Sequence, residues 1–273
     1  MRASAAASGA HMVDVRMIEV AVLLSAGRHP ASGRPRRAPL DAQALELALR
    51  LVETGHAARI HALHAGDPAN PALRDYLGMG LDRLEVLDLP SGTDPVPALV
   101  SRLRELAPAL VLAGAVAEGG EDSGMVPYLV ARSLERTLVP DVVALELSGG
   151  GAELTQALPR GRRRLVGAGL PLVATLHGSA PAARQGAFAR ARRGAVDVLP
   201  AEAAADDFLA DCTVRPWRAR PRLMASRRGG SALDRLKAAT EARTGQGRLM
   251  VRPSPEDAAS AIYDCLIEQG MIR

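Results

Sequence analysis

The sequence of 273 residues contains little cysteine, few aromatic residues and almost no lysine. Its two cysteines, Cys212 and Cys265, provide neither a disulfide framework nor a CxxC motif, which suits the reducing cytoplasm. The longest apolar stretches, Ala109–Ala117 and Leu170–Leu176, are much shorter than the roughly 20 residues that span a bilayer. We therefore expect a cytoplasmic protein without membrane insertion.

Charge is distributed unevenly between the two halves of the chain. Residues 1–150 carry 14 arginines and 18 acidic residues, a net charge of −4, whereas residues 151–273 carry 19 arginines, one lysine and 12 acidic residues, a net charge of +8. A basic half suits nucleic acid, but none of the six aromatic residues is interleaved with arginines to form a base-stacking surface. Genomic base composition also explains a bias toward arginine, and we expect no nucleic-acid partner.

Short apolar runs alternate with helical patterns between residues 17 and 200. Strands are predicted at residues 18–24, 59–65, 83–87, 109–113, 170–176 and 195–199, and helices from near 41 to 55, at 70–77, 95–106 and 123–134. Crossover helices between strands imply parallel pairing with both sheet faces covered. The predicted fold class is α/β, with a doubly wound, mostly parallel, Rossmann-like sheet.

Three regions depart from this alternation. Residues 142–147, 153–158 and 162–166 are short strands joined by glycines, which predicts an antiparallel hairpin excursion. Residues 1–16 are predicted to be a disordered leader, and residues 17–200 the nucleotide-binding-like domain. Residues 201–273 are expected to form an extended arm at 217–230 and two helices, at 233–240 and 255–269.

Ligands of open parallel sheets bind beyond the carboxyl ends of the strands. This rule selects the loops Ser25–Gly27, His64–Pro68 and Gly114–Gly124. The third loop is rich in glycine and is predicted to enter a helix at Ser123 and Gly124, a geometry suited to phosphate. The same glycines are equally explained by the turn alone. In the first helix, Asp41 is predicted to be the N-terminal cap.

Catalytic and nucleotide-binding motifs are missing from the sequence. Gly78-Met79-Gly80 lacks the third glycine of GxGxxG and is interpreted as a helix stop, and Ser148–Gly151 as a hairpin turn. His61 and His64 are predicted to point to opposite faces of a strand, which does not suit a metal site. These absences favour a binding or carrier protein over an enzyme.

Several segments, in this order and spacing, resemble the β (small) subunit of electron transfer flavoproteins, a family that includes the FixA proteins. The resemblance covers Met17–Leu199, and its segments are IEVAVLLS, RAPLDAQALELALRLVETG, ALRDYLGMGLDRLEVLD, PALVLAGAVAEGGEDSGMVPYLVARSL and GLPLVATL. It implies an adenine-nucleotide α-hydrolase-like fold and a heterodimer with an α subunit that holds most of the FAD site. Such a protein carries electrons from flavoprotein dehydrogenases to a quinone-linked acceptor and does no bond chemistry itself.

The resemblance also implies an AMP site and a docking segment for the dehydrogenase. Carried over by position, the cofactor-binding residues are Ser25, Ala26, Gly27, Leu40, His64, Gly66, Gly119, Gly120, Asp122, Ser123 and Gly124. The partner-docking residues are Pro181, Phe188 as the apolar anchor, Arg190, Arg192 and Arg193. The C-terminal arm and helices are expected either to pack on the partner subunit or to cap the core of the domain.

The sequence departs from the family pattern at both sites. Ala38 and Leu40 stand where the family has Asn and Phe, which removes a nucleotide contact and an aromatic side chain near the flavin. Glu121 and Asp122 would repel a phosphate unless they point away from it. The alternative function is a stand-alone regulatory protein of the same fold that binds an adenine nucleotide without flavin or α subunit.

Overall fold

The computed structural model describes residues 17–119, 123–148, 150–205, 211–213 and 250–268. The chain divides into two compact units, Met1–Val214 and Arg215–Arg273. The predicted leader, the arm at 217–230 and the helix at 233–240 lie outside the described residues.

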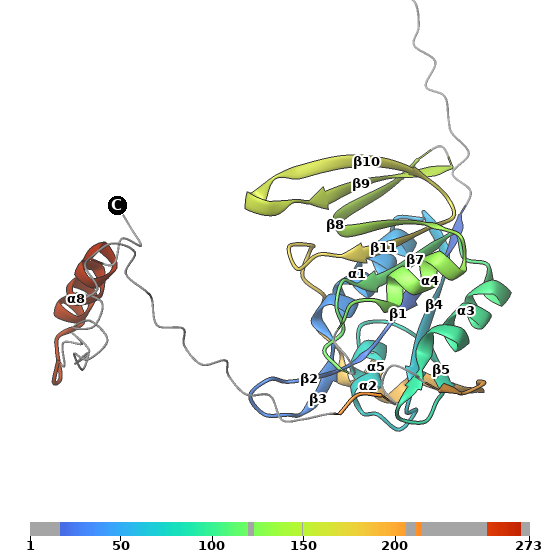
Figure 1. Cartoon of the computed structure of the whole chain (residues 1–273), viewed down its shortest axis with the longest axis horizontal. Helices are drawn as coiled ribbons and strands as arrows, with labels where there is room; N and C mark the ends of the chain where they lie inside the picture. Colours follow the sequence, from blue (N-terminus) through green and yellow to red (C-terminus); the bar gives the residue numbers. More distant parts are fainter. Residues whose placement is uncertain (1–16, 120–122, 149, 206–210, 214–249, 269–273) are drawn as a thin grey trace, which may run out of the picture. The chain divides into compact units, whose positions relative to one another are not determined.

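A nine-stranded sheet forms the centre of the first unit, in the order β10-β9-β8-β11-β7-β1-β4-β5-β12 (Figure 1). All neighbours from β11 to β12 are parallel, which confirms the doubly wound, mostly parallel α/β fold. The strands are β1 (Ile18–Leu23), β4 (Ala57–Gly66), β5 (Arg83–Asp88), β7 (Leu110–Gly114), β8 (Thr137–Ser148), β9 (Gly151–Ala157), β10 (Arg163–Gly169), β11 (Leu172–Leu176) and β12 (Ala195–Pro200).

Helices cover both faces of this sheet. In β1, Val20 and Val22 belong to one hydrophobic cluster and Ala21 and Leu23 to the other, because successive side chains of a strand point to opposite faces. Residues of α1 and α2 complete the first cluster, and residues of α3 and α4 the second. These helices are α1 (Pro39–Glu53), α2 (Ala72–Leu77), α3 (Pro95–Leu106) and α4 (Val126–Ser133). A short 3-10 helix, η1 (Pro159–Gly161), follows β9.

The antiparallel excursion is present, but its first strand is longer than predicted. The first half of β8 pairs in parallel with β11, and its second half pairs antiparallel with β9, which in turn pairs with β10. The register of β8 shifts against both neighbours near Asp141, whose φ is +55°. Thr137–Pro140 therefore belong to the core sheet before the strand leaves it.

Two predicted helix starts were wrong. Helix α1 begins at Pro39 after Ala38, and the side chain of Asp41 makes no cap hydrogen bond. Helix α4 begins at Val126, so Ser123 and Gly124 belong to the preceding loop and not to the helix.

Several short elements were not predicted. Between β1 and α1, β2 (Ala26–Arg28) and β3 (Pro35–Arg37) form a hairpin. A six-residue helix, α5 (Phe188–Arg193), precedes β12. Strand β12 is followed by β13 (Ala204–Ala205), which pairs with β6 (Thr93–Asp94).

The second unit contains α8 (Pro255–Glu268), close to the predicted 255–269, of which residue 269 lies outside the described part. Its start is capped by Ser254, whose Oγ accepts a hydrogen bond from the Asp257 backbone at 3.1 Å. Ile262, Tyr263 and Ile267 are exposed on this helix. Within the described ranges, the helices are too short or too polar to cross a membrane.

Candidate functional site

Three loops meet at the carboxyl edge of the sheet, where β7, β1 and β4 are neighbours. The chain passes from β1 to β4 and β5 on one side and returns to β7 on the other, so the strand order reverses at β1. Such a switch point is where α/β sheets bind ligands. The structure thus brings together the loops that follow β1, β4 and β7, which sequence analysis had selected.

Asp41 ties the loops after β1 and β7 to helix α1. Its carboxylate accepts hydrogen bonds from the backbone N–H and hydroxyl of Ser25, and from the Gly114 N–H at 2.9 Å. Burial raises the pKa of Asp41 to about 6, although these hydrogen bonds favour the ionised form. Asp41 therefore takes two backbone donors at the edge of the sheet that a ligand anion would otherwise use.

Tyr76 fixes the other side of the β1 loop. Its hydroxyl donates to the Ser25 carbonyl and accepts from the Ala38 N–H, both at 2.8 Å. Burial raises the pKa of Tyr76 well above its ordinary value, so the hydroxyl keeps its proton. With Asp41 and Tyr76 in place, the backbone groups and hydroxyl of Ser25 all have protein partners.

His64 and Gly66 form the end of β4. The Nδ1–H of His64 donates to the Leu24 carbonyl at 2.8 Å, which leaves Nε2 as an acceptor. Burial lowers the pKa of His64, so the ring is neutral at pH 7. Gly66 has a φ of +146°, and a Cβ there would lie 3.1 Å from His64 Nε2. A side chain at Gly66 would crowd this acceptor.

The loop after β7 packs directly on the β2–β3 hairpin. Glu118 accepts hydrogen bonds from Arg36, with Nε to Oε2 at 3.0 Å, and its Oε2 lies against Gly27, where a Cβ would be only 2.5 Å away. A Cβ at Gly119 would lie 2.8 Å from the Ala26 carbonyl oxygen. The two loops therefore touch, which leaves no room for a phosphate between Gly27 and Glu118.

The other predicted nucleotide ligands lie further along the same loop. Gly120 and Asp122 are outside the described residues, whereas Ser123 and Gly124 directly precede helix α4. Gly124 has a φ of +68°, a conformation that favours glycine. Ser123 and Gly124 therefore lie in the loop before α4, beyond the contact between Gly27 and Glu118.

Leu40 occupies the position expected near the flavin. It is half-buried in the first turn of α1, and its Cδ2 would lie 3.8 Å from a Cβ added at Gly178, just after β11. A Cβ added at Gly114 would lie 2.8 Å from the Cβ of Leu40, so only glycine fits at position 114. Leu40 thus presents an aliphatic surface at the same edge of the sheet.

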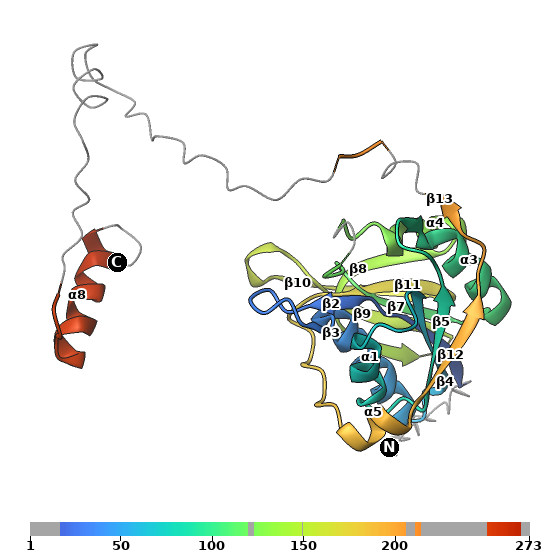
Figure 2. The same ribbon diagram turned by 90° about the horizontal axis from the view of Figure 1, so that it is seen from below.

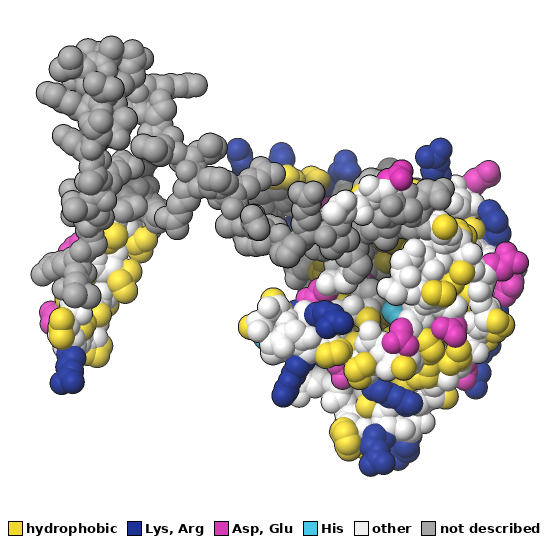
Figure 3. Space-filling model, turned by 60° about the horizontal axis from the view of Figure 1, so that its bottom comes forward, with side chains coloured by type: hydrophobic (Ala, Val, Ile, Leu, Met, Phe, Trp, Pro, Cys, Tyr) yellow, Lys and Arg dark blue, Asp and Glu magenta, His cyan; other side chains and the backbone are white. Residues whose placement is uncertain are grey.

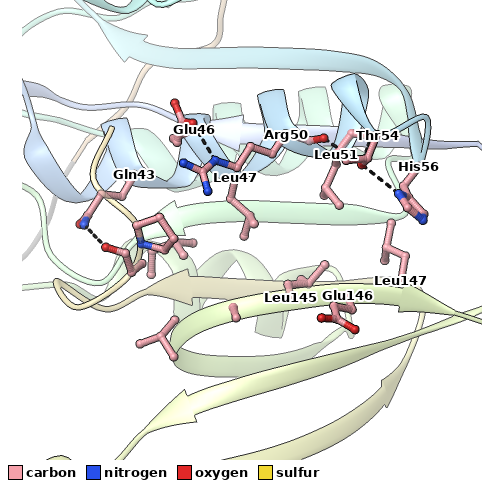
Figure 4. A pocket seen from close by; sticks show the side chains of 15 residues that line it. Gln43, Glu46, Leu47, Arg50, Leu51, Thr54, His56, Leu145, Glu146 and Leu147 are labelled. Carbon is pink, nitrogen blue, oxygen red and sulfur yellow. Dashed lines mark hydrogen bonds and ion pairs between the residues drawn. The ribbon is translucent and has the colours of Figure 1, made fainter. Parts of the chain in front are cut away.

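A groove of about 390 Å³ lies elsewhere, between α1 and β8 (Figure 4). Leu47 and Leu51 of α1 face Leu145 and Leu147 of β8 across it. None of the expected nucleotide ligands lines this groove, and of the expected docking residues only Pro181 does. The sequence had given no indication of it, because its walls are residues ordinarily assigned to the core.

The expected docking segment ends in helix α5, which lies beside α2 (Figure 1). The Phe188 side chain is 77% exposed, and the guanidinium carbon of Arg192 lies 5.9 Å from its ring centroid. Arg190 and Arg193 are also exposed. Figure 3 shows arginine and hydrophobic side chains together at the end of the first unit where Figure 2 places α5.

His61 and His64 lie apart and do not form a pair. His61 lies in β4 with Nε2 3.0 Å from Glu19 Oε2, whereas His64 contacts Leu24. No cluster of three or more potential metal ligands occurs among the residues that the structure describes.

The fold defines a class of protein, the doubly wound α/β domains with a mostly parallel sheet. Within that class, the family model described as "Electron transfer flavoprotein domain" matches residues 35–204. The chain is also 41% identical to the electron transfer flavoprotein subunit beta of Chromohalobacter salexigens, over 94% of this chain and 96% of that protein. The chain therefore belongs to the electron transfer flavoprotein β-subunit family.

Proposed function

We propose that this chain is the β subunit of a heterodimeric electron carrier in the cytoplasm, which takes electrons from flavoprotein dehydrogenases and passes them to a quinone-linked acceptor. Its observational support is helix α5, where the exposed Phe188 lies beside Arg192 and shares the helix with the exposed Arg190 and Arg193. A small apolar anchor with a charged rim suits transient electron-transfer contacts. Family membership supports the α subunit as the stable partner.

In this proposal FAD, held mainly by the α subunit, supplies the redox chemistry. The contribution of this chain is to cover one side of the flavin with Leu40 and the adjoining edge of the sheet. A bound AMP would be held by His64, Gly66, Ser123 and Gly124, because Ser25 and the Gly27–Glu118 contact are committed to the protein interior. The neutral His64 ring offers an acceptor at Nε2, which suits an amino group.

The proposal is tested by co-expressing the chain with the α subunit from the same source. Gel filtration should give a one-to-one complex with a flavin spectrum, and nucleotide analysis of the denatured complex shows whether AMP is present. A panel of flavoprotein dehydrogenases from that source, each with its own substrate, should include one that reduces the complex. A colourless monomer that ignores the α subunit but retains a nucleotide would favour the regulatory alternative.

A further inference from the structure

The docking segment between β11 and β12 has almost no apolar side chains with which to pack on the core. Residues 178–187 read GSAPAARQGA, and only Ala180 and Ala183 reach the hydrophobic cluster, with single methyl groups. Such a composition is flexible unless polar contacts fix it. The position of Phe188 therefore depends on hydrogen bonds between this segment and the helices beneath it.

These hydrogen bonds come from α1 and α2. On the β11 side, Gln43 Nε2 donates to the Ala180 carbonyl at 2.8 Å. Beside α5, the Ala187 N–H donates to the Gly78 carbonyl at 2.8 Å, and Arg74 donates to the Gly194 carbonyl at 2.8 Å. Between these two ends, the side-chain hydrogen bonds with α1 among the described residues are made by Arg184.

Arg184 spans two carboxylates of helix α1. Its Nε lies 2.7 Å from Glu46 Oε2 and its Nη1 2.6 Å from Glu53 Oε1, and its own backbone N–H also donates to Glu46, at 3.1 Å. The Glu46 side chain is only 5% exposed. Buried charge-assisted hydrogen bonds of this kind are stronger and more geometrically specific than surface ion pairs.

The charge states of the carboxylates agree with this geometry. Burial alone would raise the pKa of Glu46, yet hydrogen bonds from Arg184 and Arg50 hold it below its ordinary value. The hydrogen bond from Arg184 likewise lowers the pKa of Glu53. Both carboxylates are therefore ionised at neutral pH, where they accept the hydrogen bonds of Arg184 as charged groups.

We propose that Arg184 is a positioning residue, which fixes the docking segment on α1 so that Phe188 is held ready for the dehydrogenase. This inference rests on the proposed function of the α5 surface. Ordering a flexible loop on binding costs affinity, and a segment that is already ordered avoids that cost. Arg184 contacts neither the flavin nor the dehydrogenase in this scheme and acts through Phe188.

The test compares Arg184→Ala with Arg50→Ala in the FAD-loaded heterodimer. Arg50 is the matched control, because it also pairs with Glu46, at 2.8 Å, and makes no hydrogen bond with the docking segment among the described residues. For the fastest dehydrogenase of the panel, Arg184→Ala should raise KM about tenfold, through the restored cost of ordering the loop, with kcat little changed. Arg50→Ala should change KM less than twofold. Reduction of both variants by dithionite, which needs no docking, should match the parent heterodimer.

Amide hydrogen exchange supplies a second readout that does not depend on the dehydrogenase. Exchange at residues 182–191 should rise in Arg184→Ala and stay at the parent level in Arg50→Ala, and Arg184→Lys should be intermediate. Unchanged exchange in Arg184→Ala would overturn the positioning role while leaving the proposed function intact. If Phe188→Ala leaves KM unchanged, the α5 surface is not the docking site, and the role of Arg184 in docking is overturned with it.

Discussion

Asp41 is a buried carboxylate at the centre of the fold, and its burial disfavours the ionised form. It joins α1 to the loops after β1 and β7, and burial raises its pKa to about 6, from an ordinary value of 3.8. The folded protein thus binds the proton more tightly than the unfolded chain does. This part of the stability is present below pH 4 and is lost as the pH rises through about 6.

Asp41→Asn is therefore expected to gain stability relative to the parent as the pH rises. Between pH 4 and pH 6.5 the difference in unfolding free energy should move in favour of the variant by about 2 kcal/mol. Urea unfolding followed by circular dichroism at several pH values measures this difference. Asp82→Asn, at an exposed aspartate after α2, serves as the control, and a similar pH dependence in both variants would contradict the argument.

Tyr76→Phe isolates a second buried polar group. The change removes the hydroxyl that bridges Ser25 and Ala38 while the ring still fills the core. Because both backbone groups are left without a partner, we expect a loss of about 1 to 3 kcal/mol of unfolding free energy. Tyr128→Phe, at a tyrosine that is 44% exposed, should change stability by less than about 0.5 kcal/mol. Equal melting temperatures for the two variants would rule out a structural role for the hydroxyl bridge.

At the scale of elements, the hydrophobic pattern of the sequence predicted the strands and helices whose positions depend on the burial of apolar side chains. The central strands β1, β7 and β11 are continuous apolar runs because both faces are covered, and that pattern placed them and the helices between them. The β2–β3 hairpin and α5 were missed because each is short and polar and is held by tertiary contacts. The cap predicted at Asp41 was wrong because the hydrogen-bond partners of its side chain, Ser25 and Gly114, are 16 and 73 residues away in the sequence.

The packing of the β2–β3 hairpin makes Gly27 a sensitive position. An added Cβ would lie 3.0 Å from the Arg36 carbonyl oxygen and 3.1 Å from the Ala38 Cα, in addition to its contact with Glu118. Gly27→Ala should therefore destabilise the protein by about 1 to 3 kcal/mol through overpacking. Gly167→Ala in β10 is the control, because a Cβ there meets nothing within 4 Å. Thermal unfolding distinguishes them, and no loss at Gly27 would mean that the hairpin moves freely away from α1.

At the scale of the whole molecule, the basic C-terminal half acquires a specific meaning at α5. Arg190, Arg192 and Arg193 share the six-residue helix α5 with the exposed Phe188, and the guanidinium carbon of Arg192 lies 5.9 Å from the Phe188 ring centroid. An acidic partner surface would therefore be attracted to α5 before contact, and such steering acts on the association rate and weakens with salt, because the Debye length falls from about 30 Å at 0.01 M to about 10 Å at 0.1 M. Composition alone indicated the sign of the charge but could not show that part of it lies on the same short helix as an exposed aromatic side chain.

Replacing these three arginines by glutamine should therefore remove most of the salt dependence of electron transfer from the dehydrogenase. In the parent heterodimer, kcat/KM should fall steeply between 10 and 200 mM NaCl, and in the triple variant it should start lower and change little. The matched control replaces Arg160, Arg162 and Arg163, which are exposed around η1 and β10, and so removes the same charge elsewhere. Stopped-flow reduction of the flavin measures all three proteins. If the control loses as much salt dependence as the α5 variant, net charge, and not the arginines of α5, governs the encounter.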